Sequence, residues 1–195
     1  NGVKIVYEEC ETGYDTARGV ECYERLKGKH GGATLFQPLS TGITFALTDK
    51  APTDKIPIIS AGYGRSESQD GLVFGWNFPL AGTYWVGADV LVQHIAKKEG
   101  GWDKLKGKKF ALVYHDSPFG KEPIPQLQER AKLHGFEVQL LLERIAPGVP
   151  VGLADQRDRS RSIRKPVRDL HGAGHEGVVV FVEPVHQSPF VGLLG

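Results

Sequence analysis

The sequence of 195 residues contains no methionine and only two cysteines, Cys10 and Cys22. Two cysteines are too few for a four-ligand zinc site, so one disulfide or two free thiols are the remaining alternatives. Because the chain starts with asparagine and not methionine, Asn1 is not expected to be the natural start. No secretory segment, with a basic stretch followed by an apolar one, is visible near Asn1.

The chain also lacks a long hydrophobic run and an excess of charge. Its longest apolar stretches, such as Ile56–Ile59 and Val178–Val182, are far shorter than the roughly 20 residues that a membrane-spanning helix needs. The 24 Lys and Arg residues nearly balance 23 Asp and Glu residues, which argues against a nucleic-acid or membrane-surface partner. With 40% hydrophobic and 24% charged residues, the composition is typical of a globular protein with a real core.

Strand-like and helix-like patterns alternate along the chain. Strands are predicted at residues 3–7, 33–36, 56–60, 73–78, 110–114, 137–141 and 178–182. Helices are predicted from an Asp15 cap to about Gly28, and at residues 43–50, 83–98 and 124–134. The alternation predicts an α/β fold with parallel sheets.

Ligands of parallel α/β folds bind beyond the carboxyl ends of the strands. Three loops begin where predicted strands stop, at residues 38–42, 61–66 and 115–120. The hydroxyls of Ser40 and Thr41 are expected either to cap the next helix or to hold a carboxylate. Phe119 is expected at a loop tip, where burial against its own domain would be difficult.

Other chemistries find little support in the sequence. The Gly-x-Ser-x-Gly spacing of a nucleophile elbow is absent, although a small hydrolase using Ser40 with His115 stays an alternative. His171 and His175 are four residues apart in a glycine-rich stretch, which is a weak metal signal. No phosphate-binding loop is present, so phosphate cofactors find no support. We expect no catalytic residue, metal or cofactor.

Cys10 follows a predicted strand, and Cys22 lies in the next predicted helix. A packed strand-helix unit would bring Cys10 and Cys22 to bridging distance. If the disulfide forms, it implies an oxidising compartment.

Four segments together resemble a known family. They are YEECETGYD at 7–15, FQPLSTGIT at 36–44, IISAGYGR at 58–65 and ALVYHDSPFG at 111–120. Their order and spacing are similar to those of type I periplasmic binding proteins, within the branched-chain amino acid, amide and urea group of ABC-transporter substrate-binding proteins. The resemblance covers residues 1 to about 146 and implies two α/β lobes that close on a small ligand without performing chemistry on it.

The resemblance also implies ligand-binding positions. Ser40 and Thr41 match the loop that holds a ligand carboxylate, and the stretch Gly62, Tyr63 and Gly64 matches the second contact loop. Phe119 matches an aromatic position on the opposite lobe, where it cannot donate a hydrogen bond. Arg65 is a candidate for binding an acid, and Tyr84 is a further candidate contact.

The predicted domains are a partial first lobe at residues 1–103, the start of a second lobe at 104–146, and an atypical Arg- and Gly-rich tail at 147–195. Its Arg-rich stretch at residues 157–168 is expected to be a solvated linker or loop. Relatives begin with a further strand and helix and continue beyond Pro147, so the chain is expected to be a fragment. Without that first strand, a strand edge and apolar surface would be exposed unless something covers them.

The sequence therefore predicts the periplasmic substrate-binding component of an ABC importer, which binds an amino acid, amide, urea or aromatic acid and docks on permease subunits. The alternatives are a cytosolic amide-sensing regulator on the same fold, with reduced cysteines, and the small hydrolase.

Overall fold

The computed structural model describes residues 2, 4–61, 64–142, 177–181 and 190–194. The chain forms two compact units, one of residues 1–84 and 187–195 and the other of residues 85–186. We call them unit 1 and unit 2. Within the described ranges, no helix is long and apolar enough to cross a membrane.

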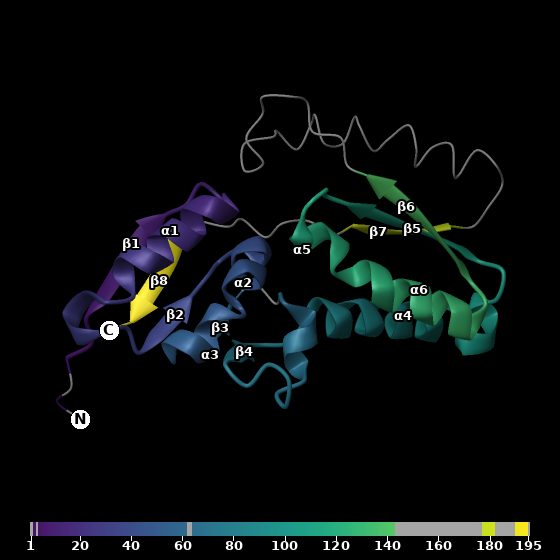
Figure 1. Cartoon of the computed structure of the whole chain (residues 1–195). Coiled ribbons are helices and arrows are strands. Elements are labelled where there is room, and N and C mark those ends of the chain that lie inside the picture. The colour runs from purple at the N-terminus through teal and green to yellow at the C-terminus, as the bar shows by residue number, and fades with distance from the viewer. Residues whose placement is uncertain (1, 3, 62–63, 143–176, 182–189, 195) are drawn as a thin grey trace. The chain divides into compact units, whose positions relative to one another are not determined.

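Unit 1 contains a sheet of five strands. In spatial order they are β1 (Tyr7–Glu11), β8 (Phe190–Leu194), β2 (Leu35–Gln37), β3 (Ile58–Ser60) and β4 (Asn77–Pro79) (Figure 1). Neighbours among β2, β3 and β4 are parallel, with Phe36 opposite Ile58. The strand β8 runs antiparallel to both β1 and β2 and joins them. The strand edge that the sequence analysis expected to need a cover is therefore paired with the chain's own C-terminal strand.

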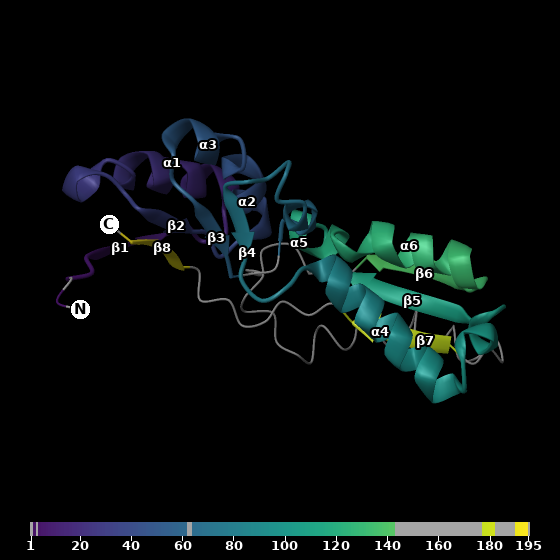
Figure 2. The same ribbon diagram turned by 90° about the horizontal axis from the view of Figure 1, so that it is seen from below.

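The helices of unit 1 cover one face of this sheet, as Figure 2 shows. They are α1 (Thr16–Leu26), α2 (Thr41–Leu47) and α3 (Lys50–Asp54), with short 3-10 turns η1 (Lys29–Gly31) and η2 (Ser66–Gln69). The core that they share with the sheet contains Tyr23, Leu26, Phe36, Ile43, Leu47 and Ile58. Gly19 allows α1 to approach α2 closely, because a Cβ at this position would overlap Ile43.

Two local features fix α1. The Asp15 carboxylate accepts a hydrogen bond of 2.8 Å from the Arg18 amide and so caps the helix, as predicted. A disulfide between Cys10 and Cys22, with 5.9 Å between their Cα atoms, ties β1 to α1. Of the two alternatives left open by the sequence, the disulfide is thus confirmed.

Unit 2 contains the parallel sheet β6 (Glu137–Leu142), β5 (Lys109–Tyr114) and β7 (Gly177–Phe181), with β5 in the middle. Its helices are α4 (Tyr84–Glu99), α5 (Pro118–Lys121) and α6 (Pro123–His134), and a 3-10 turn η3 (Trp102–Leu105) follows α4. In Figure 1, α4 and α6 lie along the same side of these strands. Their common core is apolar and includes Val92, Ile95, Phe110, Leu112, Leu127 and Phe136.

The predicted α/β class with parallel sheets is confirmed, whereas several element bounds differ. A strand was expected at 3–7, but β1 begins at Tyr7, because pairing with β8 and the burial of Cys10 select the next stretch. The strand expected at 73–78 is reduced to β4. The Asp70 carbonyl accepts from the amides of Val73 and Phe74, and the resulting turn occupies the residues before β4.

The grouping of the chain also differs from the predicted division after residue 103. Helix α4 groups with unit 2, because its buried face packs with Phe110 and Leu112 of β5. From the predicted tail at 147–195, the structure describes β7 and β8. The Arg-rich stretch at 157–168 and the histidine pair of the weak metal signal, His171 and His175, lie outside the described residues.

Candidate functional site

The candidate site lies at the carboxyl ends of β2 and β3 in unit 1. Because these strands are parallel neighbours, the segments that follow them leave the sheet at the same edge. Ser40 and Thr41 follow β2, and Gly64 and Arg65 come shortly after β3. Two other predicted positions, Gly62 and Tyr63, lie outside the described residues.

Ser40 and Thr41 are held rigidly at the start of α2. The Ser40 hydroxyl accepts a hydrogen bond of 3.4 Å from the Ile43 amide, so the predicted capping role is confirmed. The Thr44 hydroxyl donates to the Ser40 carbonyl at 3.0 Å. Both Ser40 and Thr41 are buried, at 4% and 3% exposure. The capping bond therefore fixes the Ser40 hydroxyl, and burial restricts the Thr41 side chain.

A buried chain of hydrogen bonds extends this support along α2. The Thr48 hydroxyl donates to the Thr44 carbonyl at 2.7 Å, and the Asn77 side-chain amide donates to the Thr48 hydroxyl at 3.0 Å. Asn77 is the first residue of β4, so the chain joins the helix that carries Thr41 to the sheet. Buried polar groups that are fully bonded in this way stiffen their surroundings.

Gly64 lies directly against Thr41. A Cβ added to Gly64 would lie 2.5 Å from the Thr41 Cγ2 and 2.6 Å from its Oγ1. Only a residue without a side chain fits there, so the glycine brings the backbone of the second loop onto the hydroxyl of the first. The structure thus places these two predicted site residues together.

Two buried hydroxyls near the same loop have no hydrogen-bond partner among the described residues. They belong to Ser60, the last residue of β3, and to Ser68 in η2, which are 2% and 3% exposed. A buried hydroxyl without a partner carries a cost of about 1–3 kcal/mol. Ser60 is therefore a candidate to bond a ligand or a water molecule, and the sequence analysis did not select it.

Tyr14 is a further candidate that sequence reasoning missed. It follows β1 and adopts a left-handed backbone with φ of 63°, which is uncommon outside glycine. Burial raises the pKa of Tyr14, and a side-chain hydrogen bond with Ser40 opposes the rise. The phenol thus lies beside the first loop of the site. A tyrosine after Gly13 indicates only a turn, so the sequence carried no signal for it.

Arg65 has three partners within unit 1. Its guanidinium carbon lies 4.6 Å from the centre of the Phe45 ring and 4.9 Å from that of Phe74. Its Nε donates to the Glu67 carboxylate at 3.2 Å. These contacts hold the side chain beside the site.

The two remaining predicted residues are Phe119 and Tyr84. The expectation that Phe119 is exposed at a loop tip is wrong, because the residue lies in α5 and is 4% exposed. The Ser117 side chain caps this helix by accepting from the Gly120 amide, which draws the segment into a helical turn. Tyr84 is half-buried at the start of α4.

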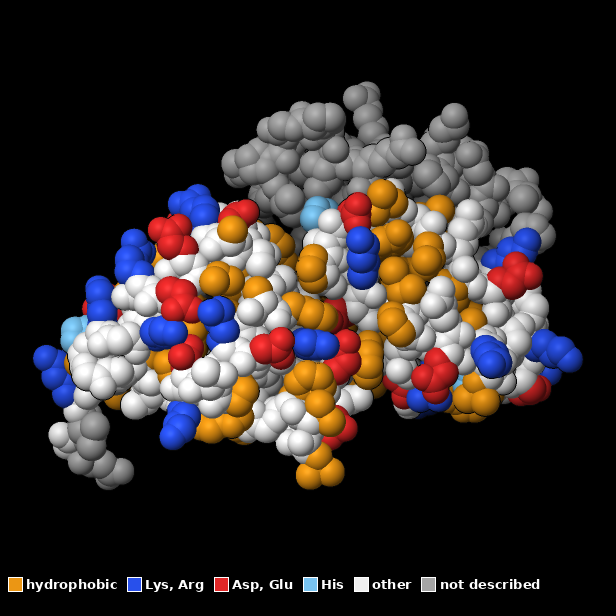
Figure 3. Space-filling model, viewed as in Figure 1, with side chains coloured by type: hydrophobic (Ala, Val, Ile, Leu, Met, Phe, Trp, Pro, Cys, Tyr) orange, Lys and Arg blue, Asp and Glu red, His pale blue; other side chains and the backbone are white. Residues whose placement is uncertain are grey.

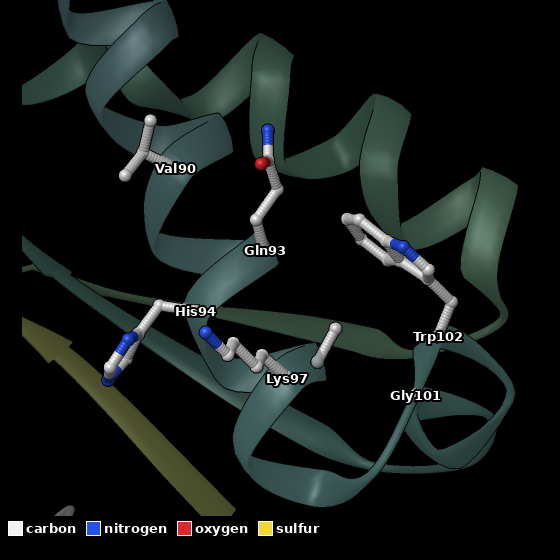
Figure 4. Close-up of a pocket in the computed structure, with 7 residues that line it drawn as sticks. Val90, Gln93, His94, Lys97, Gly101 and Trp102 are labelled. Carbon is white, nitrogen blue, oxygen red and sulfur yellow. The ribbon is translucent and has the colours of Figure 1, made fainter.

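Unit 2 has a separate hollow on α4 and η3, shown in Figure 4. Val90, Gln93, His94 and Lys97 of α4 line it together with Gly101 and Trp102. Trp102 is 41% exposed, and its ring stacks on that of His134 with 4.2 Å between the ring centres. None of the predicted site residues lines this hollow, and His94 and Trp102 project to opposite sides of it (Figure 4).

Neither the charges on the face of unit 1 in Figure 3 nor the metal-binding side chains of the described residues indicate a second site. Over unit 1, acidic and basic side chains are interspersed on the face shown in Figure 3. Among the residues that the structure describes, no group of three or more His, Cys, Asp or Glu side chains is arranged to hold a metal ion.

Comparison with known proteins shows the family of the chain. Residues 1–165 match the family described as periplasmic binding protein, so the match extends past residue 146, where the sequence resemblance ended. No curated protein matches the chain. The chain belongs to the periplasmic binding protein family.

Solved structures show the same fold. One, from the Pseudomonas fluorescens group and described as an ABC transporter permease, is 37% identical over 95% of this chain, with a TM-score of 0.69. A branched-chain amino acid ABC transporter protein from Thermus thermophilus with bound valine is 23% identical over 90% of the chain, with a TM-score of 0.67. A solute-binding protein from R. palustris in complex with 4-hydroxybenzoate is 16% identical over 88%, with a TM-score of 0.59. The chain spans 42%, 40% and 40% of these three structures, respectively.

Proposed function

We propose that this chain is a non-catalytic substrate-binding component of an ABC importer, and that unit 1 binds the carboxylate or amide group of a small amino acid, amide, urea or aromatic acid. The observation that carries the proposal is the contact between Gly64 and Thr41, beside the capped Ser40. This contact brings a hydroxyl and a side-chain-free backbone to one point at the carboxyl edge of a parallel sheet.

The chemistry of the site suits an oxygen-bearing ligand. Hydroxyls both donate and accept, and backbone amides donate, so they satisfy a carboxylate or an amide without a bound metal. The Ser60 hydroxyl, which has no partner within the part of the chain that the structure describes, adds one further group at the end of β3. The structures with bound valine and with 4-hydroxybenzoate, both carboxylic acids, support this ligand class.

Gly62, Tyr63 and Tyr84 remain proposed contacts. Phe119 also remains a proposed contact, although it lies within α5 and not at an exposed loop tip.

We place the protein in the periplasm, with the permease subunits of the importer as its partners. The family match and the Cys10–Cys22 disulfide support this location, because disulfides persist in oxidising compartments. The same disulfide disfavours the cytosolic regulator. The hydrolase is disfavoured because the Ser40 hydroxyl caps α2 and the family binds solutes.

Thermal-shift and calorimetric titrations with valine, leucine, urea, acetamide, benzoate and 4-hydroxybenzoate test the proposal. At least one probe is expected to raise the melting temperature by mass action. Thr41→Val removes the hydroxyl while keeping the shape of the side chain, and Gly64→Ala pushes the loop off Thr41. Both variants are expected to weaken binding of that probe by about tenfold or more, since each lost bond to a charged group is worth about 1.5–3 kcal/mol.

Thr53→Val is the matched control. Thr53 lies in α3 of the same unit, where its hydroxyl donates to the Asp49 carbonyl at 3.4 Å on the exposed surface. This variant is expected to bind the probe like the unmodified chain. If none of the six probes shifts the melting temperature, or if Thr53→Val weakens binding as much as Thr41→Val does, the proposed site is refuted.

A further inference from the structure

Arg65 connects two segments of unit 1 that the backbone does not connect locally. One ring against its guanidinium belongs to Phe45 in α2, and the other belongs to Phe74 in the turn before β4. That turn is closed by hydrogen bonds from the Phe74 amide to the Asp70 carbonyl at 2.9 Å and from the Asn77 amide to the Phe74 carbonyl at 3.0 Å. The arginine therefore joins the turn to the helix.

The contacts on α2 follow the pitch of the helix. Thr41 and Phe45 are four residues apart, so they lie one above the other on one face of the helix. Gly64 lies against Thr41, and the next residue, Arg65, lies against Phe45. Two consecutive loop residues thus pair with two consecutive turns of α2, and this pairing fixes the register of the loop on the helix.

The charge of Arg65 is already matched within this cluster. Glu67 accepts from its Nε at 3.2 Å, and the side chain is only 25% exposed. A guanidinium over aromatic rings is held by its planarity as well as by its charge. Lysine carries the same charge but has no planar group to lie over the rings.

Resting on the proposed function, we infer that Arg65 is a positioning residue, which clamps the 64–74 segment to α2 through Phe45 and Phe74 and thereby holds Gly64 against Thr41. In this role Arg65 is not the group that binds the carboxylate of the ligand. It determines instead how well the two loops of the site are aligned.

Amide hydrogen exchange tests the clamp without any ligand. In Arg65→Lys and Arg65→Met, amides of residues 41–47 and 64–76 are expected to exchange about tenfold faster, because the ring contacts that oppose local opening are lost. Phe74→Leu is expected to have the same effect in the same two segments. If exchange in these segments stays unchanged in Arg65→Lys and Arg65→Met while both remain folded, the inference is overturned.

Arg130→Lys and Arg130→Met are the matched controls. Arg130 is 27% exposed and its Nε also donates to a carboxylate, that of Asp89, but it lies in unit 2. These variants are expected to leave exchange in residues 41–47 and 64–76 unchanged. Faster exchange there in the Arg130 variants would mean that the effect is global and would count against the clamp.

A binding measurement separates positioning from direct contact. Benzoate and benzamide differ in charge at the group that the site would bind, as do valine and valinamide. If Arg65 only positions the loops, Arg65→Lys is expected to weaken binding of both members of a pair by the same factor. If Arg65 contacts the ligand directly, Arg65→Met is expected to weaken binding of the acid selectively. If neither pair binds the unmodified chain, the proposed ligand class fails, and the exchange result alone decides whether Arg65 clamps the segment.

Discussion

The two units are built on the same strand-helix principle but are stabilised by different means. Unit 1 combines its apolar core with a disulfide and a buried chain of hydroxyl and amide hydrogen bonds. It also buries two hydroxyls that have no hydrogen-bond partner among the described residues. The described core of unit 2 consists of apolar side chains, with Phe110 stacked on Phe136 at 4.2 Å. The buried polar groups of unit 1 lie where a ligand would be bound. The disulfide and the hydrogen-bond chain of unit 1 offset the free-energy cost of burying them.

The largest expected loss of stability follows from a substitution in unit 2. Phe110→Ala should lower the free energy of unfolding by about 3–5 kcal/mol, because it leaves a cavity at a fully buried position of the core. Urea unfolding followed by circular dichroism measures the change. Phe78→Ala, at a position that is 49% exposed, is the control and should cost far less. Equal costs at the two positions would contradict the packing of Phe110.

Loss of the disulfide should cause the next largest loss of stability, and it should destabilise unit 1. Replacing Cys10 and Cys22 by alanine opens a closed loop with a sequence separation of 12 residues, which costs about 3 kcal/mol. A reductant should destabilise the unmodified chain by a similar amount and leave the double variant unaffected. A reductant that changes neither chain would show that the bridge contributes nothing to stability.

The buried hydrogen-bond chain should contribute less. Thr48→Val leaves the Asn77 side-chain amide without its acceptor at 3.0 Å, at a cost of about 1–3 kcal/mol. Thr53→Val, on the exposed side of the same unit, should change stability by less than about 0.5 kcal/mol. Urea unfolding of both variants makes the comparison. If Thr48→Val is as mild as Thr53→Val, the polar support of α2 is not energetically important.

The smallest expected effect is electrostatic. A hydrogen bond from Lys27 is the main cause that holds the pKa of Asp54 below its ordinary value, and a hydrogen bond from Tyr23 adds to it. A lowered pKa in the folded state stabilises the protein at pH values above the unfolded pKa, and this contribution is lost as the pH falls through the folded pKa.

Asp54→Asn should therefore cost less than about 1 kcal/mol near neutral pH, because the pair is partly exposed. The cost should disappear in acid and shrink in high salt. Thermal unfolding across acidic and neutral pH measures it. A difference between the two chains that grows as the pH falls would contradict the ion pair.

Much of the fold could be predicted from local patterns. Asp15 and Ser40 are followed by apolar residues at helical spacing, so both helix starts were predictable, to within two residues for α2. The β-branched and apolar run at 110–114 predicted β5. Phe119 was misjudged, because the sequence shows a residue before Gly120 but not the Ser117 cap that turns the segment into α5.

The sequence by itself determined the class of fold, the loops that could bind a ligand, and the residues available there, since alternation, capping and glycine placement act over a few neighbouring residues. Only the tertiary structure decided which of those residues meet. Residues that are distant in the chain are joined by the contact of Gly64 with Thr41, the contact of Arg65 with Phe45, the pairing of β8 between β1 and β2, and the grouping of α4 with β5. Such contacts depend on how whole elements pack, which no short stretch of sequence encodes.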